Sequence, residues 1–265
     1  MFSMNRTNHY AESAVKRLPA FAIGLTVLIL AGCSTTGDGG AYDFRCPDLP
    51  LAQLSIIDVS QSGRDETLIG ERLDAVQADA EFVTDCEGTL IVRAASGSVA
   101  NAELLFSGRL STSGSTEIAR DRKIPEAVEA TMAEIRKSLN TALARTTPQG
   151  NDLIAMFALV SDVALQFASK EVDLRASLYT DAISTTGGAA INESGLDRAA
   201  VQEIVGAQSL PQLDGVTVSI RGVGRVGGSV QPPQDYVDLV NDYARRICQA
   251  TGADCAVLTS TNAIR

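Results

Sequence analysis

Short apolar runs of strand length alternate with longer segments of helical periodicity between residues 51 and 258, and this alternation restricts the fold more than any other feature. It predicts an α/β fold in three layers, a doubly wound, mostly parallel sheet with helices on both faces. No internal repeat or linker interrupts the pattern, so one domain is expected over residues 48–265. The expected strands are 51–59, 87–95, 103–110, 171–180, 216–221 and 256–258, and the expected helices are 66–82, 125–143, 152–169, 196–207 and 236–247.

Three of these segments carry further information. The run 51–59 is mostly apolar, as expected for a central strand that is buried on both sides. Pro125 suits the first turn of the helix that it opens. The segment 152–169 is apolar nearly all round, which predicts a buried helix.

Residues 1–32 have the features of an export signal. Basic residues precede an uncharged apolar run at 18–30, which is too short for a comfortable membrane span. The run ends in Leu-Ala-Gly-Cys, which closely resembles a bacterial lipobox. That resemblance implies cleavage before Cys33, a diacylglycerol on its thiol, and an extracytoplasmic lipoprotein with a flexible tether at 33–47. A plain signal peptide and an N-terminal anchor helix are the alternatives.

Removal of this signal would leave no imidazole in the chain, because His9 is the only histidine. A Ser-His-Asp triad, a Cys-His pair and a zinc site that needs imidazole would then be excluded. The formal net charge of −10, with no clustered Lys and Arg, also argues against nucleic acid as a partner. Any metal ion is therefore expected to be a hard cation on oxygen ligands.

Four cysteines remain after the predicted lipid anchor, and an even number in an exported protein indicates disulfides. Three pairings are possible. Proximity along the chain favours Cys46 with Cys86 and Cys248 with Cys255. Four buried thiols are the alternative.

Oxygen-bearing side chains gather where the expected strands and helices end. Asp58, Ser60 and Ser62 follow the first strand, Asn151 lies between two helices, and Asp181 follows the fourth strand. Open parallel sheets bind ligands at the carboxyl ends of their strands, where the strand order reverses. Carboxylate, hydroxyl and amide oxygens suit Mg²⁺ or Mn²⁺. The alternative is that these groups only cap helices and bond to one another.

The motif Asp58-x-Ser60-x-Ser62 after an apolar strand resembles the first metal-site motif of von Willebrand factor type A (VWA) domains. The later junctions at Asn151 and Asp181 match the family in order and approximate spacing, and the resemblance covers about residues 49–259. It implies that Ser60 and Ser62 bind the metal directly and that a partner's carboxylate completes the shell. Asn151 replaces the family's usual Thr, and Ala182 replaces a common Gly.

Two other segments suggest different functions. Residues 222–227 (GVGRVG) match a dinucleotide fingerprint, but Pro232 and Pro233 delay the helix that such a site requires. A flexible loop is the better interpretation, and no nucleotide is expected. Residues 95–115 are rich in Ser, Gly and Ala, and an ordinary edge hairpin is favoured over a rim that binds a partner.

The sequence thus predicts a lipid-anchored VWA-like protein, not an enzyme, that recognises an acidic group on an envelope or surface protein through a divalent cation. A structural scaffold of a cell-envelope complex without metal is the first alternative. An exported hydrolase using Ser60 is the second, and it would require a nearby base such as Lys123 or Lys170.

Overall fold

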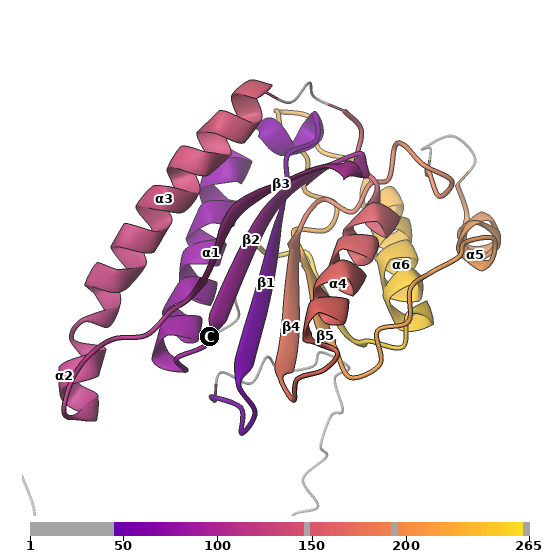
Figure 1. The fold of residues 1–265 in the computed structure, drawn as a ribbon. Coiled ribbons are helices and arrows are strands. Elements are labelled where there is room, and N and C mark those ends of the chain that lie inside the picture. The colour runs from indigo at the N-terminus through magenta and orange to yellow at the C-terminus, as the bar shows by residue number, and fades with distance from the viewer. Residues whose placement is uncertain (1–44, 146–148, 192–195, 262–265) are drawn as a thin grey trace, which may run out of the picture. The chain divides into compact units, whose positions relative to one another are not determined.

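The central element of the structure, a computed structural model that describes residues 45–145, 149–191 and 196–261, is a six-stranded sheet. The strand order is β3-β2-β1-β4-β5-β6, and every neighbouring pair is parallel except β2 and β3. The order reverses between β1 and β4 (Figure 1). The strands are β1 (Leu51–Asp58), β2 (Thr89–Ser96), β3 (Ser98–Arg109), β4 (Asp173–Tyr179), β5 (Thr217–Arg221) and β6 (Asp254–Leu258).

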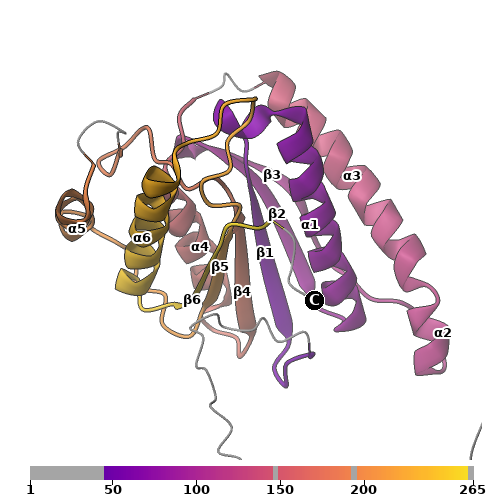
Figure 2. The same ribbon diagram turned by 180° about the vertical axis from the view of Figure 1, so that it is seen from behind.

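Helices cover both faces of the sheet (Figures 1 and 2). On one face α1 lies against β1 and β2, and α3 lies against β2 and β3. On the other face α4 crosses β1 and β4, while α6 packs on β6 and carries α5 on its outer side. The helices are α1 (Glu66–Asp85), α2 (Glu117–Asp121), α3 (Ile124–Arg145), α4 (Leu153–Phe167), α5 (Arg198–Gly206) and α6 (Gln234–Ala250).

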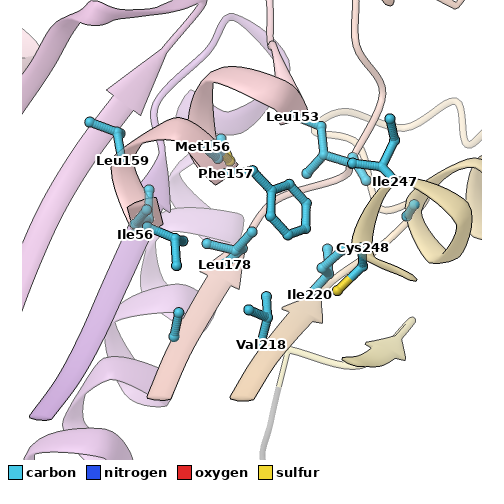
Figure 3. Packing of buried hydrophobic residues seen from close by; sticks show 14 of the residues in the cluster. Ile56, Leu153, Met156, Phe157, Leu159, Leu178, Val218, Ile220, Ile247 and Cys248 are labelled. Atoms are coloured by element: carbon cyan, nitrogen blue, oxygen red, sulfur yellow. The ribbon is translucent and has the colours of Figure 1, made fainter. Parts of the chain in front are cut away.

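Two hydrophobic clusters hold these layers together, one on each face of the sheet. All eight residues of β1 are buried, as expected for a strand covered on both sides. In the larger cluster, Phe157 of α4 packs with Leu178 of β4 and Ile247 of α6 (Figure 3). Burial of this apolar surface is the main force that fixes the helices on the sheet.

The α1 face also contains polar groups. Asp79 of α1 is buried, and its Oδ2 accepts hydrogen bonds of 2.6 Å from both the Ser55 and Tyr179 hydroxyls. Burial raises the pKa of Asp79, while the positive charge of Arg221 lowers it. Burial of these polar side chains without partners would cost free energy. The hydrogen bonds among Asp79, Ser55 and Tyr179 offset that cost.

The sheet confirms the fold class expected from the sequence, and each expected strand and helix is present. The favoured edge hairpin is also present, because β2 turns through Gly97, at a φ of 66°, into antiparallel β3. The short helix α2 was not expected. The expected burial of α4 was too high, because Leu165 is 71% exposed.

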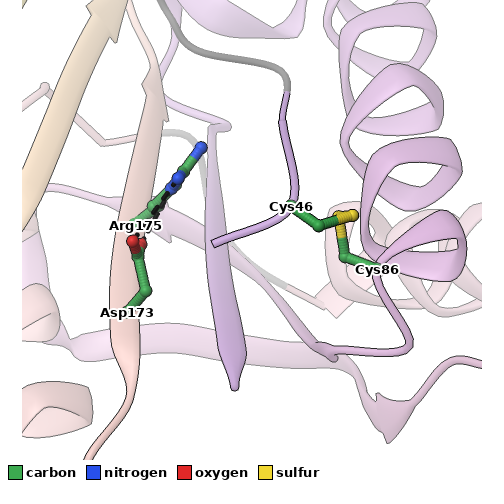
Figure 4. The surroundings of a disulfide bond; sticks show 4 residues. All are labelled: Cys46, Cys86, Asp173 and Arg175. Carbon is green, nitrogen blue, oxygen red and sulfur yellow. Dashed lines mark hydrogen bonds and ion pairs between the residues drawn. A yellow bond between two sulfur atoms is a disulfide. The ribbon is translucent and has the colours of Figure 1, made fainter. Parts of the chain in front are cut away.

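The two disulfides predicted from proximity are present, Cys46–Cys86 and Cys248–Cys255. The first joins the segment before β1 to Cys86, the residue that directly follows α1 (Figure 4). The second joins α6 to β6. The predicted signal peptide and Cys33 lie outside the described residues. No helix of the described part is long and apolar enough to cross a membrane.

The two disulfides should contribute unequally to stability, because they close loops of different length. The cysteines are 40 residues apart in Cys46–Cys86 and 7 apart in Cys248–Cys255. Chain entropy predicts a loss of about 4 kcal/mol for Cys46→Ala with Cys86→Ala, and of about 2 kcal/mol for Cys248→Ala with Cys255→Ala. Urea unfolding of both double variants measures the difference, and a smaller loss for the longer loop would contradict this account.

Candidate functional site

The first part of the site is the turn that leaves β1. The amide of Ser60 donates a 2.8 Å hydrogen bond to Oδ1 of Asp58, which folds the chain back directly after the strand. A single 3₁₀ turn at Ser62–Arg64 follows. Asp65 then caps α1 by accepting hydrogen bonds from the amides of Thr67 and Leu68. This strand-turn-helix junction holds both serine hydroxyls above the end of β1.

The second part comes from the end of β4 and the start of α4. Thr180 and Asp181 directly follow β4, whose neighbour is β1. Asn151 lies two residues before α4, and its carbonyl accepts hydrogen bonds from the amides of Thr185 and Thr186. These bonds fix the Asn151 backbone against the loop that follows β4.

The structure brings all five predicted metal ligands into one hydrogen-bonded network. Ser62 Oγ donates to Asp181 Oδ2 over 2.6 Å and lies 3.3 Å from Ser60 Oγ. Asn151 Nδ2 donates to Asp181 Oδ1 at 3.0 Å and to Thr180 Oγ1 at 2.7 Å. Thr180 Oγ1 in turn donates to Asp58 Oδ2 at 3.0 Å.

The network is deeply buried except at Ser62. Asp58, Ser60, Asn151 and Asp181 are at most 1% exposed, whereas Ser62 is partly exposed. The side-chain oxygen of Asn151 is buried and has no hydrogen-bond partner among the described residues. A buried polar atom without a partner costs free energy, and a hard cation would supply one. The donor set, two carboxylates, two hydroxyls and this amide oxygen, fits Mg²⁺ or Mn²⁺.

The two carboxylates raise each other's energy at close range. Burial, and after it the negative charge of Asp58, raise the pKa of Asp181 to about 6. Hydrogen bonds from Ser62 and from the Ile183 amide act in the opposite direction, as does the positive charge of Arg72. The site is therefore an electrostatic environment that favours a bound positive charge.

Backbone geometry also marks the site as specialised. Ala182 has a φ of 59°, in the left-handed region that favours glycine. Gly150 lies so close to Thr185 and Thr186 that a Cβ would fall 2.3 Å from the Thr185 hydroxyl oxygen. Gly150 directly precedes Asn151, so its lack of a Cβ lets the chain before Asn151 pack against the loop that follows β4.

Two further residues, which were not expected among the ligands, contact the predicted site. The Thr180 hydroxyl accepts a hydrogen bond from Asn151 and donates one to Asp58. Arg72 of α1 forms an ion pair with Asp58. Thr180 gave no signal beyond its place next to Asp181. Arg72 did give one, because it falls between Leu68 and Val76 on the buried stripe of α1.

The GVGRVG segment contacts the site as a well-anchored loop. The Gly224 amide donates to the carbonyl of Asp181 at 2.8 Å, and the Gly227 amide donates to that of Ser62 at 3.3 Å. Arg225 forms a 2.6 Å ion pair with Glu71 of α1. The next helix begins only at Gln234, so these glycines do not present a helix N-terminus to a pyrophosphate.

Two other candidate groups have structural roles. Asp152 caps α4 by accepting from the Ile154 and Ala155 amides, and it lies outside the ligand network. Cys46, Cys86 and Asp85 lie close together, but the two sulfur atoms are bonded to each other. A disulfide has no thiolate to offer a metal ion, so this group supplies a single carboxylate.

No protein-family model matches the sequence, and no curated protein matches it. The solved structures to which it is similar include the conserved hypothetical protein BatB from Bacteroides thetaiotaomicron, at 14% identity and a TM-score of 0.39, covering 79% of this chain and 90% of that one. They also include a von Willebrand factor type A protein from Catenulispora acidiphila, at 16% identity and a TM-score of 0.40, covering 80% of this chain and 39% of that one. At these scores nothing about function is drawn from the likenesses.

The decisive observation is internal to the chain: the DVSQS motif ends the central strand of a 3-2-1-4-5-6 sheet, and the two later motif elements close around it. The fold is VWA-like. In this VWA-like domain the side chain of Asn151 bonds to Asp181 through its amide nitrogen.

Ionisation of Asp181 should make the metal-free VWA-like domain less stable as the pH rises. Its pKa is about 6 in the folded protein against 3.8 ordinarily, so the native state holds the proton more tightly. The free energy of unfolding should then fall between pH 3.8 and about 6 and level off above that window. Urea unfolding in EDTA, compared with Asp181→Asn, measures this slope; an equal slope in both proteins would contradict the assignment.

Proposed function

We propose that this chain is a lipid-anchored, extracytoplasmic VWA-like protein that binds a partner protein through a divalent cation. The cation is Mg²⁺ or Mn²⁺, held by Asp58, Ser60, Ser62, Asn151 and Asp181. The partner is an envelope or surface protein that presents an acidic group. No chemical step is assigned to the site, whose role is binding.

The observation that carries the proposal is the buried oxygen of Asn151, which has no partner in the described part of the chain and belongs to a side chain bonded to Asp181. Ser62 is the partly exposed member, so its side of the site is where an external carboxylate would complete the coordination shell. When bound, the metal supplies positive charge for that carboxylate.

The lipid anchor and the extracytoplasmic location rest on the sequence before Cys46 and on the disulfides. Two disulfides within one domain agree with an oxidising compartment. A hydrolase using Ser60 is less well supported, because its hydroxyl bonds to Ser62 and to no lysine or carboxylate among the described residues.

Titration of the purified domain with Mn²⁺ or Mg²⁺ tests the metal site. We expect one ion per chain, and at least about tenfold weaker binding for Asp58→Asn, because it removes a charge from a buried site. Asp65→Asn is the matched control: it removes a neighbouring carboxylate that caps α1, and Asn caps a helix equally well. Calorimetry that detects no binding by the wild type would rule out the metal site.

A metal-free scaffold is the second candidate function, and a capture experiment distinguishes the two. The full chain is used as bait in solubilised envelopes, once with Mg²⁺ and once with EDTA. The proposed function predicts that the partner is retained only with Mg²⁺ and is lost with Asp58→Asn. Equal capture under both conditions would favour the scaffold. Cys33→Ser should in parallel move the protein from the membrane fraction to the soluble fraction.

A further inference from the structure

Arg72 places a permanent positive charge directly beneath the site. Its side chain is 2% exposed, and Nη2 lies 3.9 Å from Oδ2 of Asp58. The residue lies on α1 one turn after Leu68 and one turn before Val76, both of which are buried in the core. Burial of a charged side chain is costly unless it is paired. The carboxylate of Asp58 therefore offsets the cost of burying the positive charge of Arg72.

The guanidinium also closes the turn that carries the two serines. Nη1 donates to the backbone carbonyl of Asp58 at 2.5 Å and to that of Gly63 at 3.0 Å. These carbonyls lie at the two ends of the segment that contains Ser60 and Ser62. A Cβ on Gly63 would fall 2.7 Å from Nη1, so the glycine leaves the room that the guanidinium occupies. One side chain thus holds the metal-site turn in its closed shape.

The same charge alters the balance of the site. With both carboxylates ionised, Asp58 and Asp181 carry two negative charges, and Arg72 neutralises one of them. A divalent cation then binds a site whose net charge is −1. The bound cation also lies near the positive charge of Arg72, which repels it. The pair is buried, so solvent and salt screen this repulsion only weakly. Once loaded, the site has a net positive charge, which suits an acidic partner.

We propose that Arg72 is a resident counter-cation, which holds the metal-site turn closed when no ion is bound and lowers the affinity of the site for divalent cations. This inference rests on the proposed metal-binding function and adds a positioning residue to it. The site is preformed by the arginine and binds its metal loosely. A partner's carboxylate adds the negative charge that Arg72 cancels.

The test compares the Mn²⁺ affinity of the purified domain with that of Arg72→Met and Arg72→Gln. Both variants remove the charge, and Gln keeps a donor for one of the two carbonyls. We expect them to bind Mn²⁺ at least about tenfold more tightly than the wild type, despite a lower melting temperature. Arg72→Lys keeps the charge and should show no such gain. Arg120→Met, which removes a charge on α2 that is 40% exposed, is the surface control.

A purely structural Arg72 would give the opposite sign, because a loosened turn binds metal less well. Equal or weaker binding by folded Arg72→Met and Arg72→Gln would therefore overturn the proposal. If no protein, wild type included, binds Mn²⁺, the proposed function itself fails. Binding by the neutral variants alone would support the inference about Arg72 but would rule out metal binding by the natural chain.

Amide hydrogen exchange of the wild type tests the clamp without any substitution. The amides of Ser60, Gln61 and Gly63 all donate hydrogen bonds in the closed turn. In EDTA these amides should be protected, and Mg²⁺ should change their protection by less than about threefold. Free exchange in EDTA followed by strong protection with Mg²⁺ would show that the ion, not Arg72, closes the turn.

Discussion

Two carboxylates buried side by side at the ends of β1 and β4 impose the constraint to which the surrounding structure responds. Asp58 and Asp181 cannot both carry charge in a water-poor site without compensation. The chain compensates with hydroxyl and amide donors from three segments, and with one guanidinium. The strand order that reverses beside β1 makes this convergence possible, because it brings loops from opposite faces to one edge.

Much of the fold could be predicted because the core patterns are local. The apolar run of β1, the stripe of α3 and the interval between strands each occupy a single window of sequence. The edge position of β3 followed from its Ser- and Gly-rich surroundings. The short helix α2 could not be predicted from periodicity, since five residues with no buried member present no apolar face.

The site shows a different limit. The positions of the five predicted ligands at the ends of strands and helices indicated that they lie close together. Only the structure shows which atom of each side chain bonds to which partner. The Asn151 amide bonds to Asp181 through nitrogen and leaves its oxygen without a described partner, which no spacing could reveal. Arg72 was overlooked because a charged residue inside a helix is usually solvated. Its position between two buried residues was the available signal.

The Cys46–Cys86 disulfide has a mechanical consequence. It lies at the end of the sheet where the parallel strands begin, and the site lies at the opposite end, where they finish. It joins the segment before β1 to the end of α1. Tension applied through the segment before Cys46 passes across the covalent bridge into the junction of α1 and β2, as well as into β1. A load between that segment and a molecule held at the site is therefore shared by two neighbouring strands, and the central strand is not peeled out alone.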